Sequence, residues 1–387
     1  MVPVYLIRMK ILSRRLVLAL TACVVLFLGA SQDLAGSSRH GYFITRNGFR
    51  MPIYGMSLIH DANGNRGMSC ARLDEVQLDT MRFDRQVSHI LAVSSPHAVV
   101  GTPGNGATFE VTYLDPQGSG FNDASQGETR RRALETAVAA WTKVLQGTVT
   151  IKVSAVMEKQ DDGDGNDNTS LLASAGATEF WNIEGKAVPS ALAWQLTGKR
   201  AKEAGDFDIE VNVNSEINWD YALNGQAARD KSSFVYTLIH EIGHGLGFLD
   251  TFDSETGELA NAIPSPYDVY INKGSGSVNR IKDHNADTVV GELVSNDLFF
   301  GGPAAIDASK RSIKPLPMIK LYAPDPYEQG SSISHVDQKT YADFKTGLMT
   351  PQDFGSGTDK IDILTLGIMK DMGYQLIPNA VTARVPQ

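Results

Sequence analysis

The residues best suited to chemistry lie in the pentapeptide His240-Glu241-Ile242-Gly243-His244. Two histidines four positions apart lie on the same face of a helix, so both imidazoles can bind one metal ion. Neutral imidazole suits zinc well. Glu241 follows the first histidine and can accept a proton from water that the metal activates. The pentapeptide therefore predicts a hydrolytic zinc site.

A catalytic zinc site usually has three protein ligands, so a third residue must come from elsewhere in the chain. Asp250 follows His244 by six positions, with a glycine between them that can provide the turn. Carboxylate is an acceptable zinc ligand. His335 lies farther along, in a serine-rich segment shortly before Leu348-Met349-Thr350-Pro351. Spacing alone does not decide between Asp250 and His335, and Asp253 is a weaker alternative.

The elements that must position these residues can be read from hydrophobic periodicity. The apolar stretch before the pentapeptide predicts a buried helix from about Ser232 to Gly247, with Ser232 or Ser233 as its N-cap. A second helix is expected over residues 128–145, ended by Gly147. Alternating apolar residues predict strands at 109–113, 149–153 and 209–213. This order of elements indicates an α+β or α/β layered fold.

Beyond the pentapeptide, the chain resembles the metzincin metallopeptidases, most closely those of the leishmanolysin type and related bacterial secreted proteases. The active helix of that family is similar to residues 240–248. Its later third histidine lies in a Ser-x-x-His segment similar to Ser332-Ile333-Ser334-His335-Val336-Asp337. A Leu-Met turn similar to Leu348-Met349 follows, and then a helix end similar to residues 365–374. The resemblance spans about residues 107–376 but is specific only around 232–250 and 318–376.

The resemblance implies that His335 is the third zinc ligand, which makes Asp250 the less favoured alternative. It also implies that Met349 supports the metal site from below without binding the metal. Val336 stands where the family commonly has an aromatic residue, and no tyrosine follows Met349 closely. The fold implied is an α+β, metzincin-like zincin fold. It has a twisted mixed sheet, an active-site helix and a C-terminal subdomain with the Met-turn, with a cleft between two subdomains.

Cys70 raises a further hypothesis through the same resemblance. Metzincins can have a pro-segment cysteine that occupies the zinc ion and keeps the enzyme latent, and thiolate is a good zinc ligand. Cys70 precedes the catalytic region, where such a residue belongs. Its surroundings match no established switch motif, so a buried free cysteine is the alternative interpretation.

The chain divides into three predicted parts. Residues 1–30 hold positive charges followed by a short apolar run, which is typical of a secretory signal peptide, with cleavage after Ala30 or Ala35. A lipoprotein signal at Cys23 and an uncleaved anchor are alternatives. Residues 31–104 form a pro-segment or an N-terminal part of the domain. Residues 105–387 form the catalytic domain, in which the insertion from about 250 to 317 has no predicted structure.

Composition and charge narrow the function further. The formal net charge of -9 provides no basic surface for nucleic acid, and signal removal leaves Cys70 as the one cysteine, so no disulfide forms within a mature chain. The acidic segment Asp161 to Asn168 departs from a calcium loop and is expected to be a solvated turn.

We therefore expect a secreted, periplasmic or cell-surface zinc endopeptidase that acts on protein or peptide substrates. The mature form is expected to lack a stable membrane span. One alternative is a zinc-stabilised surface or binding protein with little activity. A second is an enzyme that hydrolyses another amide, such as that of a cell-wall peptide.

Overall fold

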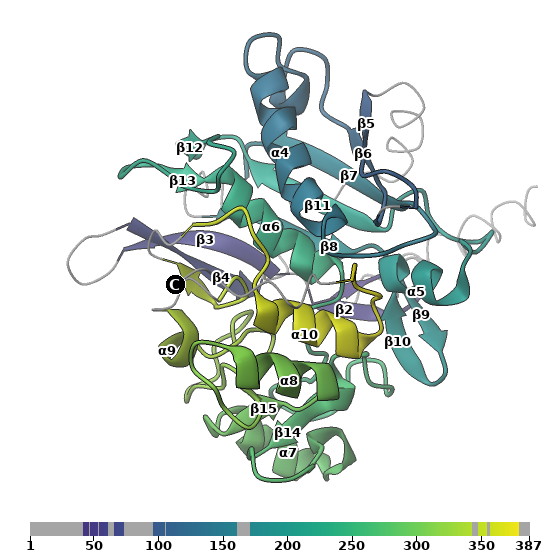
Figure 1. The fold of residues 1–387 in the computed structure, drawn as a ribbon, viewed down its shortest axis with the longest axis vertical. Helices are drawn as coiled ribbons and strands as arrows, with labels where there is room; N and C mark the ends of the chain where they lie inside the picture. Colours follow the sequence, from purple (N-terminus) through teal and green to yellow (C-terminus); the bar gives the residue numbers. More distant parts are fainter. Residues whose placement is uncertain are drawn as a thin grey trace, which may run out of the picture. The chain divides into compact units, whose positions relative to one another are not determined.

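An eight-stranded mixed sheet forms the centre of the computed structural model (Figure 1). The structure describes residues 42–45, 47–52, 54–60, 66–72, 96–104, 106–160, 171–342, 347–353 and 357–378. In spatial order the strands are β17 (Gln352–Asp353), β4 (Arg66–Arg72), β3 (Tyr54–His60), β8 (Leu171–Ala177), β11 (Ile209–Asn214), β7 (Ile151–Glu158), β6 (Phe109–Tyr113) and β5 (His97–Val100). The pairs β6–β7 and β7–β11 are parallel, and the remaining neighbours are antiparallel.

The strands predicted from alternation are present as β6, β7 and β11, although β7 begins at Ile151, two residues after its predicted start. Phe109, Val111 and Tyr113 of β6 are buried, and the same spacing places Ile209 and Val211 of β11 in the core. Helices pack against one face of the parallel strands β6, β7 and β11. This burial explains why these strands are rich in apolar residues. The α+β class expected from the sequence is confirmed.

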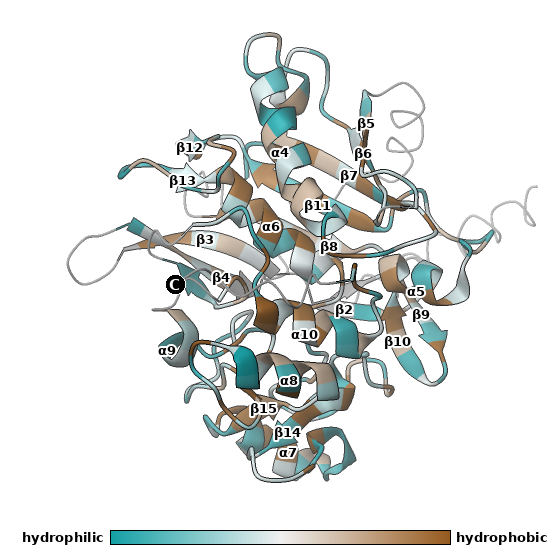
Figure 2. Ribbon diagram, viewed as in Figure 1, coloured by the Kyte–Doolittle hydropathy of each residue, from teal (hydrophilic) through white to brown (hydrophobic). Residues whose placement is uncertain are grey.

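Two long helices pack side by side on this sheet, α4 (Gly127–Thr142) and α6 (Phe234–Gly245) (Figure 1). Every residue of α6 is buried, and hydrophobic residues run along it and along α10 (Figure 2). Of the two predicted caps, Ser233 is the N-cap, because its side chain accepts from the backbone N–H of Tyr236. Trp141 joins the helices by donating from its indole N–H to the Ile239 carbonyl, at 3.1 Å.

The predicted end of α4 is wrong by three residues. The helix ends at Thr142, before the expected Leu145 and Gly147. Leu145 forms an antiparallel bridge with Leu376, and Gln146 N–H donates to the Gln375 carbonyl. The backbone at Leu145 and Gln146 therefore pairs with a distant segment, although the local apolar periodicity favours a helix there.

The insertion that had no predicted structure forms a small subdomain after α6. A three-stranded sheet of β14 (Ile271–Lys273), β15 (Leu298–Phe300) and β16 (Ile319–Lys320) packs near α7 (Ala286–Leu293) and α8 (Pro303–Arg311). The helices α9 (Gln338–Tyr341) and α10 (Ile363–Met372) complete it. Gly367 lets α10 approach α8 closely, because a Cβ there would lie 2.8 Å from that of Ala308.

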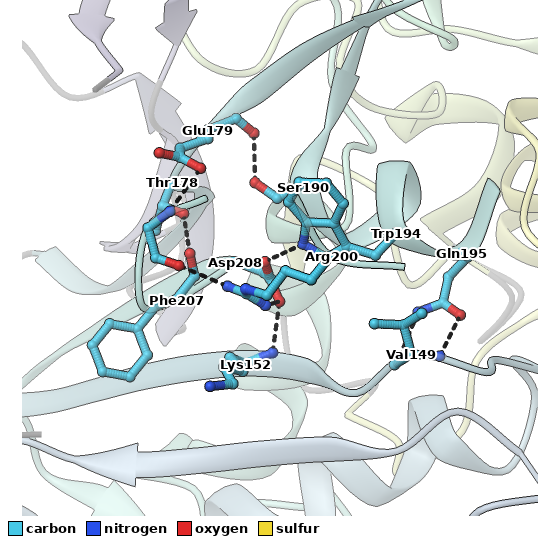
Figure 3. Close-up of polar contacts among 11 residues, drawn as sticks. Val149, Lys152, Thr178, Glu179, Ser190, Trp194, Gln195, Arg200, Phe207 and Asp208 are labelled. Atoms are coloured by element: carbon cyan, nitrogen blue, oxygen red, sulfur yellow. Dashed lines mark hydrogen bonds and ion pairs between the residues drawn. The ribbon is translucent and has the colours of Figure 1, made fainter. Parts of the chain in front are cut away.

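A second peripheral unit consists of the hairpin β9 (Phe180–Ile183) and β10 (Lys186–Pro189) with α5 (Ser190–Thr197). Buried Asp208 anchors it to the main sheet (Figure 3). Its carboxylate accepts from the Trp194 indole at 2.6 Å, from Arg200 at 2.8 Å and from Lys152 N–H at 2.8 Å. Burial raises the pKa of Asp208, and its carboxylate accepts from three residues, so we interpret this cluster as structural.

Shorter elements connect the larger ones. They are the pair β1 (Tyr42–Ile44) and β2 (Arg50–Pro52), the parallel pair β12 (Trp219–Asp220) and β13 (Ser232–Ser233), and 3-10 turns at Gly120–Asn122, Asp268–Tyr270 and Ile281–Asp283. Since β13 leads directly into α6, its pairing with β12 fixes where this helix begins.

The described part of the N-terminal region is integrated in the main sheet. β3 pairs with β8, and β4 lies between β3 and β17. The described residues after Gly41 belong to one compact unit. The contacts therefore give no separate body at 42–104, and its removal as a pro-segment stays a prediction.

Several predictions fall outside the described residues. They are the signal peptide at 1–30, with Cys23 and both cleavage positions, and the acidic segment Asp161–Asn168. Within the described ranges, none of the helices combines the length and hydropathy needed to cross a bilayer.

The buried carboxyl group of Asp115 should make the stability of the fold depend on pH. Its carboxylate accepts from Phe121 N–H at 3.1 Å and Met157 N–H at 2.9 Å, and burial raises its pKa from 3.8 to about 6. The folded protein therefore holds this proton more tightly than the unfolded chain. Asp115 stabilises the fold below pH 4, roughly, and this contribution is lost as the pH rises through about 6.

Urea unfolding of wild type and Asp115→Asn should therefore diverge between these pH values. The difference in free energy of unfolding should change by up to about 1.4 kcal/mol per pH unit. Asp123→Asn is the control, since hydrogen bonds led by that from Gln126 N–H lower the Asp123 pKa to about 2. A pH-independent difference for Asp115→Asn would contradict the assignment.

Candidate metal centre

The helix α6 brings His240 and His244 together one turn apart. Both side chains are fully buried, and their Nε2 atoms are 3.1 Å apart. His240 Nδ1 lies 2.7 Å from the Leu348 carbonyl, and His244 Nδ1 lies 2.7 Å from the Phe248 carbonyl. A carbonyl oxygen only accepts, so each Nδ1 carries the proton. Each Nε2 therefore presents a lone pair.

His335 completes the arrangement from the loop before α9. Its Nδ1 donates to the Ser331 carbonyl at 2.8 Å, which also leaves Nε2 with a lone pair. That Nε2 lies 3.2 Å from His244 Nε2 and 3.3 Å from His240 Nε2. The three predicted histidines thus converge, although 91 positions separate the last two.

The protonation of the three rings fits a metal ligand set. Burial lowers the pKa of His240 to about 4, and burial together with the neighbouring histidines places the pKa of His244 and His335 well below 6.5. All three are therefore neutral at pH 7. Three lone pairs facing one another in a buried site repel unless a cation lies between them.

The spacing also fits a cation of zinc's size. Tetrahedral zinc with bonds of about 2.0–2.1 Å to nitrogen holds its nitrogen ligands about 3.3 Å apart. The observed separations are 3.1, 3.2 and 3.3 Å. The residues can hold a metal ion, and the chemistry of their donors suits a transition metal.

Cys70 is the fourth member of this cluster. It lies on β4, is 1% exposed, and places its Sγ 3.7 Å from His244 Nε2. The four candidate ligand atoms all lie within 4.8 Å of one another. A tetrahedral zinc ion bound by thiolate and imidazole would hold sulfur about 3.6 Å from nitrogen. The position of the Cys70 sulfur therefore suits a fourth metal ligand, although the residues around Cys70 in the sequence match no known motif.

The backbone of Cys70 is held by the segments that carry the other site residues. Its N–H donates to the Pro351 carbonyl at 2.7 Å, and its carbonyl accepts from the hydroxyl of Ser331. Pro351 follows the Met349 turn, and Ser331 holds the ring of His335. The position of Cys70 is therefore coupled to that of the third histidine.

Glu241 follows His240 directly in α6 and is fully buried. Its Oε2 accepts from Ala175 N–H of β8 at 3.1 Å, and the backbone of Met56 in β3 also bonds to the carboxylate. Oε1 has no hydrogen-bond partner among the residues the structure describes. Burial raises the pKa of Glu241 well above 4.5, with the two backbone bonds opposing it. The residue after the first histidine thus carries a buried carboxyl group held through one of its oxygens, with the other left without a hydrogen-bond partner in the described ranges.

The Met349 turn packs against α6 on the face that carries His240, since Gly243 follows that histidine by three positions. Leu348 provides the carbonyl that orients His240, and Met349 is fully buried. A Cβ at Gly243 would lie 3.0 Å from the sulfur of Met349, so the glycine permits this close packing. The placement agrees with a supporting role for Met349.

Asp250 and Asp253 are not part of the cluster. Asp250 is buried, and its carboxylate accepts from the Ser334 hydroxyl at 2.7 Å and from Phe252 N–H at 3.1 Å. Asp253 accepts from Glu255 N–H in a local turn. Between the alternatives left open by spacing, the geometry brings His335 to the other histidines and leaves Asp250 beside Ser334.

Other histidines in the described ranges lie on different elements. His97 is on the edge strand β5, and His284 pairs with Glu292 at 2.8 Å. Sequence reasoning identified the three clustered histidines and Glu241, and it raised Cys70 only through a family resemblance. It missed Ser331 and Ser334, whose serine-rich surroundings gave no sign of their partners.

Comparison with known proteins gives one partial match. A family model described as SPBPB7E8-like matches residues 182–301, which contain α6 with His240, Glu241 and His244. The matched segment does not reach Cys70 or His335. Neither a curated protein nor a solved structure matches the chain.

The arrangement predicts one tight metal site per chain. We expect His335→Ala to lower the affinity for zinc, measured by competition with a chromophoric chelator, by more than the 10–100-fold typical of losing an outer partner. His97→Ala, which changes an exposed histidine, should leave it unchanged. Equal affinity in wild type and His335→Ala would remove His335 from the site.

Proposed function

We propose that this protein is an exported zinc metalloendopeptidase of the metzincin type, similar to the leishmanolysin-like enzymes. The observation that carries the proposal is the convergence of three buried, neutral imidazoles at 3.1–3.3 Å, with buried Glu241 directly following His240 in α6. In a zinc hydrolase, three imidazoles can bind the metal while a carboxylate serves as general base. The Leu348-Met349 turn, which packs against α6 at Gly243, gives the proposal further support.

Catalysis would depend on Glu241 as the proton carrier. When bound, zinc supplies Lewis acidity, which polarises the scissile carbonyl and makes water more acidic. Glu241 takes a proton from the attacking water and passes it to the leaving amide nitrogen as the C–N bond breaks. The products are a carboxylic acid and an amine. His240, His244 and His335 hold their rings fixed through Nδ1 throughout this sequence.

The described state is, in this proposal, latent. A catalytic zinc site keeps one coordination position open, whereas three histidines with Cys70 supply all four tetrahedral positions. Two further contacts favour latency. β3 pairs with β8 along the strand that bonds Glu241, and the backbone of Met56 also bonds to that carboxylate. Activation then requires the β3–β4 hairpin to leave the site.

Export is proposed from the N-terminal pattern of residues 1–30. The enzyme would act in the periplasm, at the cell surface or in the medium on protein or peptide substrates. The net charge of -9 does not favour a nucleic-acid partner.

A second candidate is favoured by the same four ligands. A closed site in which four protein residues fill every tetrahedral position, all of them buried, is also a property of structural zinc. The protein would then be a zinc-stabilised surface or binding protein. A casein assay of mature protein with and without chelator separates the two. Product analysis would distinguish hydrolysis of another amide, such as that of a cell-wall peptide.

The role of Glu241 can be tested in the active form. Glu241→Ala should abolish casein hydrolysis while zinc content stays stoichiometric, because the carboxylate moves protons and does not bind the metal. Glu128→Ala is a control, since that side chain is exposed on α4. Peptidase activity retained in Glu241→Ala would defeat the mechanism.

The role of Cys70 can be tested in the full-length chain. Cys70→Ser should raise hydrolysis of a short peptide by about tenfold or more, because losing about 1.4 kcal/mol of thiolate binding suffices for that change. Ser69→Ala, on the neighbouring position of β4, should behave as wild type. Unchanged activity in Cys70→Ser would argue against latency through the thiol.

A further inference from the structure

The segment that carries His335 contains a residue in an unfavourable conformation. Ile333 has a φ of +69° and is fully buried. A β-branched residue rarely adopts this left-handed region, so surrounding contacts must hold it there. Such strain is commonly found where a structure fixes a functional group, and Ile333 lies two residues before His335.

Two contacts on one side of the segment hold this conformation. The Ile333 carbonyl accepts from the hydroxyl of buried Tyr267 at 2.9 Å. Ser334 is bonded twice to Asp250: its hydroxyl donates to Oδ2 at 2.7 Å and accepts from the Asp250 N–H at 2.8 Å. All four side chains are buried, so these bonds are sheltered from water.

Asp250 also belongs to the turn that holds His244. The Phe248 carbonyl fixes the Nδ1 of His244, and Asp250 lies two residues later in the same turn. Its Oδ1 accepts from Phe252 N–H at 3.1 Å, which fixes the carboxylate in the segment directly after that turn. The carboxylate therefore links the support of His244 to the residue directly before His335.

We propose that Asp250 is a positioning residue for the metal centre, which sets the spacing of His335 and His244 by clamping Ser334. Asp250, which spacing suggests as a metal ligand, therefore acts indirectly, by positioning His335. This inference rests on the metal-binding part of the proposed function and not on peptidase activity.

The test uses the full chain and measures zinc affinity by chelator competition, together with the absorption spectrum of the Co²⁺-loaded protein. Asp250→Ala and Ser334→Ala should each lower zinc affinity by about 10–100-fold, as expected for an outer partner. The double variant should lose no more zinc affinity than Asp250→Ala alone, because both substitutions remove the same interaction between Asp250 and Ser334. The Co²⁺ bands should shift while the thiolate band remains.

Two further variants keep the test decisive. Asp250→Asn retains the shape but cannot accept from both Ser334 and Phe252, so its affinity should be intermediate and the protein should fold. Asp253→Ala, which removes a carboxylate of a local turn, should match wild type.

Wild-type affinity in Asp250→Ala would overturn the inference. So would a large loss in Asp250→Ala with none in Ser334→Ala, because Asp250 would then act directly on the metal. Absence of zinc binding in wild type would instead contradict the proposed metal centre itself.

Discussion

The mutual repulsion of three imidazole lone pairs is the constraint on which the remainder of the site depends. His240, His244 and His335 are neutral because burial lowers their pKa, and each directs Nε2 toward the others. The fold must supply bonds that hold this arrangement before any metal arrives. It does so with three carbonyls, each of which accepts from one Nδ1.

Those carbonyls come from three different parts of the chain. Phe248 lies in the turn after α6, Ser331 lies in the loop before α9, and Leu348 lies in the turn over Gly243. Trp141 fixes the helix itself by bonding to Ile239. Preorganisation of this kind means that the protein meets the cost of bringing the ligands together when it folds, which favours tight metal binding. The hydrogen bonds between Asp250 and Ser334 contribute to the same preorganisation.

Sequence reasoning succeeds where the signal is local. The helix α6 and its cap at Ser233 follow from periodicity and from serine's capping preference, and the strands β6, β7 and β11 follow from alternation. It does not give the place of β3 and β4 in the sheet, because glycine and serine interrupt the apolar pattern of both strands. Contact between Cys70 and His244, 174 positions apart, depends wholly on that pairing. Asp250 could not be assigned either, since its partner Ser334 is distant in sequence.

The central claim is that a zinc ion binds to three histidines and Cys70 in the full-length chain, and that Cys70 closes the site. Zinc K-edge X-ray absorption of the purified full-length protein tests it most directly. We predict one sulfur at about 2.3 Å and three nitrogens at about 2.0–2.1 Å. A stoichiometric zinc ion whose ligand shell contains no sulfur, or a protein that binds no zinc, would contradict the account.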